Sequence, residues 1–323
     1  MDHIFAIIAE ETTKFNLGDE EIWRDMYEPF YGEQPRDITV IRDQRYGPAE
    51  RNLLDVFVPV NNPERGKPVL MFVHGGGFFS GDKRWSEKCW ANVGHFFAQQ
   101  GIIVVIVTHQ LVTFDMNGGD DSPKSDVQYP AGANDMQLAR QWIYDNIAAE
   151  RFGRGSVDKV LLFGHSSGGA HIAMNLYGSP RKVFPPVAGV MYLSVPFWYD
   201  RTRPIRQRIL QIYYGSDAEE IWGPRSAIGL FQRLPDDSPW LKEACDAAVA
   251  FFNAYRARSS PAGTLPIMHV IDKHNHLSNV LSIGTSDTAQ ATKLLEFIRS
   301  CTTSQSTSSS KLSVSHTWSA HRD

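Results

Sequence analysis

The chain has little cysteine, with only Cys89, Cys245 and Cys301 among 323 residues. These three residues are too few and too scattered for a disulfide framework, and no two of them form a Cys-x-x-Cys pair. The sequence therefore predicts a protein of a reducing compartment whose stability does not depend on a network of disulfide bonds.

Long apolar runs and an excess of charge of one sign are also missing. No apolar stretch approaches the length needed to cross a bilayer, and the short apolar run near the N-terminus follows Asp2 without a basic residue, unlike a signal peptide. The 32 basic and 36 acidic residues give a net charge of −4, and no basic cluster indicates a nucleic-acid partner. We expect a soluble, cytoplasmic protein whose partner is a small-molecule substrate, with no nucleic acid and no membrane as partners. The oligomeric state is left open.

What is present is an ordinary globular composition, with 42% apolar and 21% charged residues. The length suits one α/β core with additions. We expect an N-terminal helical extension over residues 1–35, a catalytic domain over 36–300 and a disordered tail over 301–323, where serine and threonine predominate. Residues 197–223, rich in aromatic side chains and arginine, predict a small cap whose aromatic residues shape a pocket or only pack against the body.

The catalytic domain alternates between strand and helix patterns. Near-continuous apolar runs, typical of parallel strands buried on both faces, occur at residues 69–73, 102–107, 160–163 and 187–193. Helical periodicity covers residues 85–99 and 133–149, and a strand hairpin through Gly47 and Pro48 joins residues 38–41 to 53–58. The sequence predicts an α/β fold with a mostly parallel, doubly wound sheet and an antiparallel hairpin at its N-terminal side.

The sequence Gly-His-Ser-Ser-Gly at residues 164–168 lies between a predicted strand and a predicted helix. A Gly-x-Ser-x-Gly segment in that position makes a sharp turn that exposes the serine hydroxyl to a base and to a substrate carbonyl. Ser166 is therefore the candidate nucleophile.

Two further predicted strands end in loops that carry groups suited to act together with Ser166. The strand at 69–73 leads into His-Gly-Gly-Gly at residues 74–77, whose backbone N–H groups are suited to bind an oxyanion. The predicted strand at 265–271 leads into Asp-Lys-His-Asn-His at residues 272–276. Parallel strands end at one edge of a sheet, where ligands bind in open α/β folds, so the three loops are expected to meet.

These motifs together resemble the α/β-hydrolase superfamily. Within it the chain looks most like the esterase and kynurenine-formamidase-like branch, which is similar over residues 38–298 in its lead-in hairpin, its two glycine motifs and its histidine loop. The resemblance implies an α/β-hydrolase fold with the chain order serine, acid, histidine. It assigns the nucleophile to Ser166 and the oxyanion hole to the backbone N–H groups of Gly76, Gly77 and Ser167.

The base and the acid are less defined. His276 follows the last predicted strand and occupies the position of the family's catalytic imidazole, while His274, two residues earlier in a segment expected to be extended, would face the same side. For the acid, residues 228–234 form a weak strand candidate that leads into Pro-Asp-Asp-Ser-Pro at residues 235–239. We assign the acid to Asp237, with the following alternatives: Asp236, Asp246 and Asp272. His74, His165 and His171 are expected to be structural.

Cofactor chemistry finds no support in the sequence. Residues 76–83 approach a phosphate-binding loop but lack its Gly-Lys-Ser/Thr ending. Asp272, His274 and His276 lack a fourth ligand, and no His-Glu-x-x-His occurs, so we expect no metal and no cofactor.

The sequence thus predicts a serine hydrolase that cleaves a carboxylic ester, or an amide or N-formyl group, of a small apolar or aromatic molecule through an acyl-enzyme. The alternative is a protein of the same fold that performs elimination, cyclisation or acyl transfer in a biosynthetic pathway of secondary metabolism, or that only binds a ligand.

Overall fold

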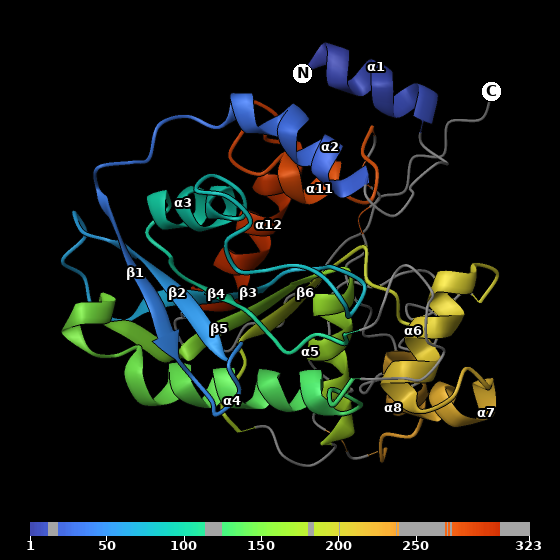
Figure 1. Cartoon of the computed structure of the whole chain (residues 1–323). Helices are drawn as coiled ribbons and strands as arrows, with labels where there is room; N and C mark the ends of the chain where they lie inside the picture. The colour runs from blue at the N-terminus through green and yellow to red at the C-terminus, as the bar shows by residue number, and fades with distance from the viewer. Residues whose placement is uncertain are drawn as a thin grey trace, which may run out of the picture.

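A computed structural model of the chain describes residues 1–11, 19–113, 125–179, 184–199, 201–236, 238, 269, 271 and 273–303. Its centre is a six-stranded sheet with the order β1-β2-β4-β3-β5-β6 (Figure 1). The strands are β1 (Ile38–Arg45), β2 (Leu53–Pro59), β3 (Lys67–Val73), β4 (Ile103–Val107), β5 (Gly155–His165) and β6 (Gly189–Leu193).

The sheet contains both antiparallel and parallel pairs of strands. β1 and β2 form an antiparallel hairpin with an irregularity between Ile41 and Gln44, and β2 runs antiparallel to β4. β3 is parallel to β4 and β5, and β5 is parallel to β6. All five residues of β4 are buried, as expected for a strand covered on both faces. The predicted mixed, mostly parallel sheet with an N-terminal hairpin is confirmed.

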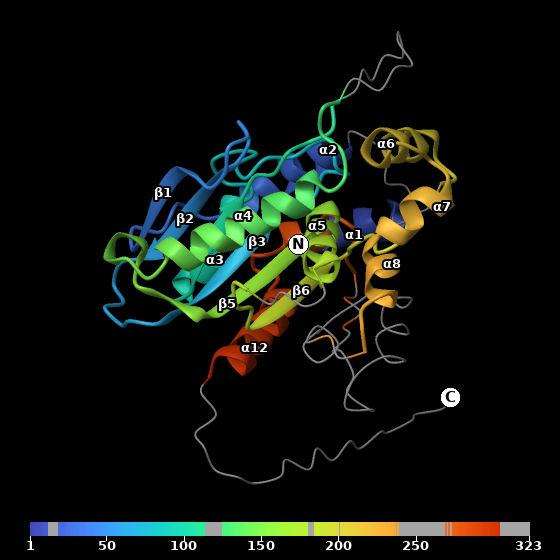
Figure 2. The same ribbon diagram turned by 90° about the horizontal axis from the view of Figure 1, so that it is seen from below.

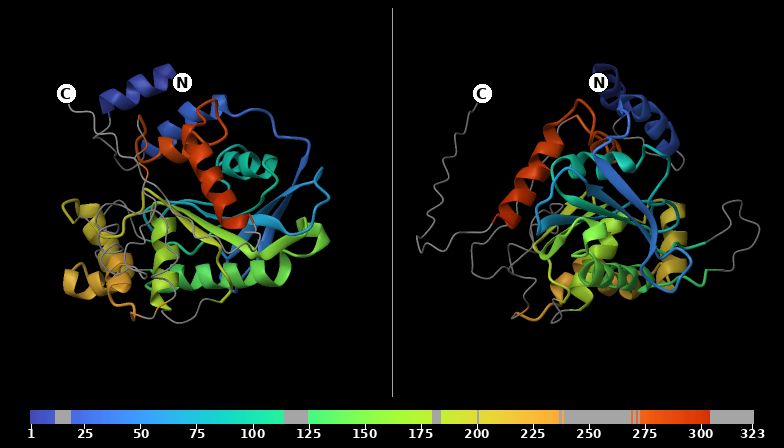
Figure 3. Two further views of the ribbon diagram at one scale, coloured as in Figure 1. Left: turned by 180° about the vertical axis from the view of Figure 1, so that it is seen from behind. Right: turned by 90° about the vertical axis from the view of Figure 1, so that its left-hand side faces the viewer.

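Successive residues of β3 belong to different apolar cores. Val69, Met71 and Val73 pack with residues from α4 and α5, whereas Leu70 and Phe72 pack with residues from α3 and α12. This alternation is the two-residue period of a strand, and it requires helices on both faces. Figure 2 shows α4 and α5 crossing one face, and Figure 3 shows α3, α11 and α12 on the other, with α1 and α2 beyond them.

The helices predicted in residues 1–35, at 85–99, at 133–149 and after Ser166 are present, whereas those in residues 204–232 and 278–302 were not predicted. Along the chain the helices are α1 (Asp2–Glu11), α2 (Asp19–Tyr27), α3 (Ala91–Gln99), α4 (Ala131–Asn146), α5 (Ser167–Gly178), α6 (Pro204–Tyr214), α7 (Glu219–Trp222), α8 (Ala227–Gln232), α11 (Ser278–Leu281) and α12 (Ala289–Thr302). Short 3₁₀ turns lie at η1 (Glu28–Phe30), η2 (Glu150–Phe152) and η3 (Gly223–Arg225). The helix expected from residue 85 begins at Ala91, and α12 continues to Thr302, past the predicted boundary of the tail at residue 301. Residues 304–323 lie outside the described ranges, so the disordered tail stays a prediction.

The strand predicted for residues 228–234 is wrong, because this segment contains helix α8. Ser226 caps the helix by accepting a hydrogen bond from the N–H of Gly229. The buried apolar residues Ile228, Phe231 and Leu234 recur every third residue, which suits one face of a helix and not the two-residue period of a strand. The acidic turn at 235–239 therefore follows a helix.

Within the described ranges, no helix is long and apolar enough to span a membrane.

Candidate active site

Ser166 lies in a sharp turn between β5 and α5. Its backbone has φ 52° and ψ −128°, a conformation that a residue with a side chain seldom adopts. The N–H of Ser166 donates to the carbonyl of Leu193 at the end of β6, at 2.9 Å. A Cβ on Gly168 would lie 2.4 Å from the carbonyl oxygens of Val73 and His74, so only glycine permits α5 to approach the end of β3 this closely.

His276 meets the hydroxyl of Ser166. Its Nε2 lies 2.9 Å from Ser166 Oγ, within hydrogen-bond distance, although the two residues are 110 positions apart in the sequence. The neighbouring His165 fixes the approach, because its Nε2 lies 2.8 Å from the carbonyl oxygen of His276. The arrangement brings a candidate base to the candidate nucleophile.

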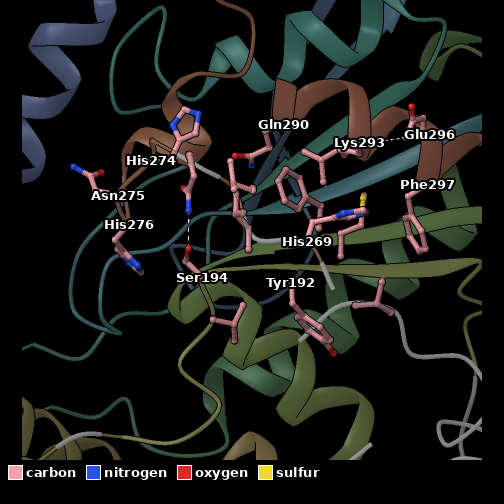
Figure 4. A pocket seen from close by; sticks show the side chains of 18 of the residues that line it. Tyr192, Ser194, His269, His274, Asn275, His276, Gln290, Lys293, Glu296 and Phe297 are labelled. Atoms are coloured by element: carbon pink, nitrogen blue, oxygen red, sulfur yellow. Dashed lines mark hydrogen bonds and ion pairs between the residues drawn. The ribbon is translucent and has the colours of Figure 1, made fainter. Parts of the chain in front are cut away.

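His274 points elsewhere, as Figure 4 shows. Its Nε2 lies 2.9 Å from Asp287 Oδ2, and its Nδ1 lies 3.2 Å from Ser278 Oγ. The expectation that His274 and His276 would face the same side is wrong, because residues 276–277 form a turn that leads into α11 rather than an extended strand. His274 therefore anchors the turn that positions His276.

Burial, followed by the positive charge of Arg206, lowers the pKa of His276 from 6.5 to about 4. The imidazole is therefore neutral at pH 7 and can accept a proton from the hydroxyl. Burial lowers the pKa of His165 in the same way, to about 3, and His165 is a neutral hydrogen-bonding partner.

The glycine loop after β3 presents free backbone donors to the same cavity. Gly76 has φ +136°, and a Cβ there would lie 1.9 Å from the carbonyl oxygen of Ser80, so the loop requires glycine. No acceptor for the N–H groups of Gly76, Gly77 or Ser167 is found among the described residues. Ser167 is the first residue of α5, where the helix dipole adds to the attraction for an anion. The three N–H groups can therefore bind an oxyanion beside Ser166.

Structural contacts hold this loop. His74 is fully buried, with Nδ1 2.7 Å from the carbonyl oxygen of Gly75. Lys83, at the loop's end, pairs with Asp43 at 2.5 Å and with Asp55 at 3.2 Å. These contacts are consistent with a structural role for His74.

The acid cannot be placed from the described residues. Asp237, Asp246 and Asp272 all lie outside the described ranges, as do most of the predicted strand at 265–271 and the helix pattern at 242–256. Asp236 is described and is exposed in the turn after α8. The assignment of the acid to Asp237 stays a prediction.

Ser166, His276 and the glycine loop line a cavity of about 460 Å³. Phe78 and Phe79 contribute from the glycine loop, and the remaining apolar wall comes from residues 195–199 and from α6. The cap predicted at 197–223 thus supplies part of the wall, including Trp198, Tyr199 and Ile209.

Sequence motifs missed a third contribution to the wall. Glu20 and Arg24 of α2, together with Trp90, also line the cavity. No short motif marks these residues, since α2 reaches the cavity only when the N-terminal extension folds back over the body.

Among the residues described here, no group of three or more histidine, cysteine or acidic side chains is arranged to hold a metal ion.

Comparisons with known proteins agree on the type of fold. The model of the Carboxylesterase family matches residues 50–183. Acetylcholinesterase of Electrophorus electricus is 31% identical over 127 residues, which is 38% of this chain and 18% of that protein. Carboxylesterase patB of Penicillium expansum is 28% identical over 216 residues, which is 62% of this chain and 36% of that protein. The chain thus matches only a minor part of these relatives' length.

Solved structures match nearly the whole chain. Esterase B of Lactobacillus rhamnosis superposes with a TM-score of 0.65 at 15% identity and covers 93% of this chain and 96% of its own. An esterase of the bacterial hormone-sensitive lipase family gives a TM-score of 0.64 at 18% identity, covering 94% and 98%. The predicted α/β-hydrolase fold is confirmed.

Proposed function

The chain has the α/β-hydrolase fold, and from this premise we propose that it is a serine carboxylesterase with Ser166 as nucleophile and His276 as general base. One observation carries the proposal: the 2.9 Å contact between Ser166 Oγ and His276 Nε2, at the edge of a cavity that is also lined by three N–H groups without an acceptor among the described residues. Similarity to carboxylesterases over residues 50–183 supports ester cleavage as the reaction.

The reaction proceeds through an acyl-enzyme. His276 Nε2 takes the proton of Ser166 Oγ as the oxygen attacks the ester carbonyl. The N–H groups of Gly76, Gly77 and Ser167 stabilise the oxyanion, and each such donor typically contributes about 3 kcal/mol in the transition state. The intermediate collapses, the alcohol leaves with the proton from His276, and a water molecule activated by the same imidazole releases the acid.

We assign the acid that orients His276 to Asp237, the third member of a Ser-Asp-His triad. Asp237 would accept the other ring N–H of His276 and stabilise the imidazolium that forms during the reaction. The chain order of Ser166, Asp237 and His276 supports this role, because the acid lies between the nucleophile and the base as in other α/β-hydrolases.

The substrate is a small ester with an apolar part. Phe78, Phe79, Trp198 and Ile209 give the cavity an apolar wall large enough for an aliphatic chain or an aromatic ring.

Replacement of Ser166 by alanine tests the mechanism. We expect the kcat for a p-nitrophenyl ester to fall by at least about 10⁴-fold, because the change removes the hydroxyl that forms the acyl-enzyme. A fluorophosphonate probe should label the unaltered protein at Ser166 and fail to label S166A. The control is Ser156→Ala, the same change at the far end of β5, which should leave both signals unchanged.

Two results would contradict the proposal. Turnover that survives in S166A would remove Ser166 as the nucleophile. A folded, unaltered protein that neither reacts with the probe nor cleaves any ester would favour non-hydrolytic chemistry or ligand binding instead.

A further inference from the structure

Arg24 is a buried cation at the wall of the cavity. Its side chain comes from α2, in the N-terminal extension, and the residue is only 7% exposed. Its Nε and Nη1 atoms are enclosed, and neither has a hydrogen-bond acceptor in the parts of the chain that the structure describes. These two nitrogens therefore lack the hydrogen bonds that normally compensate a buried polar group for the loss of water.

Aromatic rings hold the guanidinium in place without neutralising it. Its Cζ lies 3.4 Å from the centroid of the Trp85 ring and 5.9 Å from that of Trp90. Burial lowers the pKa of Arg24 despite the opposing charges of nearby acidic groups, including Glu20. The side chain remains a cation, since a guanidinium does not lose its proton in proteins, and its environment favours an added anion.

Arg24 is also close to the reacting groups. Trp90 lies between it and the catalytic turn, with its ring centroid 6.1 Å from that of His165. The charge of Arg24 contributes to lowering the pKa of His165, whose backbone precedes Ser166 directly. An anion held by Arg24 would therefore lie a short distance from the ester carbonyl.

The described lining of the cavity contains more basic than acidic side chains. Arg203 and Arg206 line it next to and within α6, and Glu20 is the one acidic side chain among its described lining residues. Among those described residues, arginines therefore outnumber carboxylates.

We propose that Arg24 recognises a carboxylate on the substrate, so that the protein prefers esters that carry a second, anionic group. This inference rests on the proposed ester hydrolysis and specifies its substrate class: half-esters of dicarboxylic acids, or esters of carboxylate-bearing alcohols and phenols. Arg24 is a binding residue and takes no part in proton transfer.

Two pairs of substrates of similar size test the preference. One pair places the carboxylate in the acyl part: p-nitrophenyl hydrogen adipate against p-nitrophenyl hexanoate. The other places it in the leaving group: 4-acetoxybenzoate against 4-acetoxytoluene. In at least one pair we expect the anionic ester to have a kcat/KM ten-fold or more higher, mainly through a lower KM. Each rate is corrected for hydrolysis without protein.

Arginine variants assign the preference to its residue. Arg24→Met should remove the preference, bringing the ratio of kcat/KM for the anionic ester to that for the neutral ester close to one. Arg24→Lys should reduce the preference at least three-fold, because a lysine lacks the planar pair of donors that binds a carboxylate. The control is Arg151→Met, since Arg151 also packs on an aromatic ring, 4.3 Å from the centroid of Phe152, but does not line the cavity. It should keep the full preference.

The inference is overturned if neither pair shows a preference in the unaltered protein, or if R24M or R24K keeps the preference in full. Should R24M fail to fold, R24K decides the assignment.

Thermal unfolding of S166A separates this inference from the proposed function. Monomethyl adipate should raise the melting temperature of S166A, whereas dimethyl adipate at the same concentration should have a smaller effect. Equal effects would count against an anion site. If the unaltered protein cleaves no ester but S166A responds to monomethyl adipate, the catalytic proposal fails and the anion site stands.

Discussion

At the scale of single residues, the site depends on the protonation of one imidazole. His276 can remove the proton from Ser166 Oγ, at 2.9 Å, only when Nε2 is unprotonated. Burial and the charge of Arg206 both disfavour the imidazolium, and they lower the pKa to about 4. The neutral form therefore persists well below the pH at which an exposed histidine would titrate.

This pKa predicts the acid limb of the pH profile. Because a base with a lowered pKa stays active as the pH falls, kcat/KM for a neutral ester should be nearly constant from pH 7.5 to pH 6 and should halve well below pH 6.5. Arg206→Met should move the midpoint upward, since it removes a positive charge that disfavours the imidazolium. Initial rates over pH 4.5–8 measure both midpoints, with circular dichroism at each pH to show that the protein stays folded. A midpoint at or above 6.5 in the unaltered protein would contradict the assignment.

At the scale of elements, the turn that leads into α11 decides where His276 lies. His274, two residues before it, contacts Asp287 at 2.9 Å and Ser278 at 3.2 Å. Asn275 adds to this network, because its side-chain oxygen accepts hydrogen bonds from the N–H groups of Leu277 and Ser278. The turn is thus fixed by polar contacts that do not touch the substrate.

Asp287→Ala should loosen this turn. The change leaves a buried imidazole without its partner, so we expect the free energy of unfolding to fall by about 1–3 kcal/mol. We also expect kcat to fall several-fold with little change in KM, because His276 is less well positioned. The control is Glu296→Ala, which removes the exposed pair with Lys293 at 3.0 Å and should cost about 0–1 kcal/mol. Urea unfolding and steady-state kinetics test both variants, and indistinguishable results for the two would refute the positioning role.

At the scale of the whole molecule, a group of buried imidazoles joins the glycine loop to the core. The ring of His74 stacks on that of His109, with centroids 4.7 Å apart, and His109 meets His171 edge-on at 4.6 Å. Burial lowers the pKa of each of these rings, and also that of His165. The folded protein therefore keeps them neutral, whereas the unfolded chain can protonate them near pH 6.5.

The stability of the protein should consequently decrease in mild acid. Between pH 6.5 and the lowered pKa values, the unfolded chain binds more protons than the folded one, so the free energy of unfolding decreases as the pH falls. Each buried histidine contributes up to about 1.4 kcal/mol per pH unit in that range. Urea unfolding at pH 7.5, 6.5 and 5.5 measures the slope, and His171→Phe should make it shallower. A stability that does not change from pH 7.5 to pH 5.5 would disprove this prediction.

Much of the fold follows from local sequence patterns. The buried strands were predictable because a strand covered on both faces consists almost wholly of apolar residues, as in β4. The turn at Ser166 was predictable because Gly164 and Gly168 permit close approaches of neighbouring backbone that a Cβ would block. The segment at 228–234 was mistaken for a strand because a short apolar stretch fits both the two-residue period of a strand and the 3.6-residue period of a helix. Its contacts with the rest of the molecule select the helix.

The sequence by itself determined the order along the chain of the strands in the central sheet and identified Ser166, His276 and the glycine loop as candidates, since these features depend on neighbouring residues. Only the tertiary structure decided that His276 and not His274 meets Ser166, because the turn at 276–277 directs the two rings apart. It alone placed Arg24 at the cavity, because α2 reaches the site through packing between residues far apart in the chain. Backbone conformation is largely set locally, whereas convergence on one cavity is set by the packing of the whole molecule.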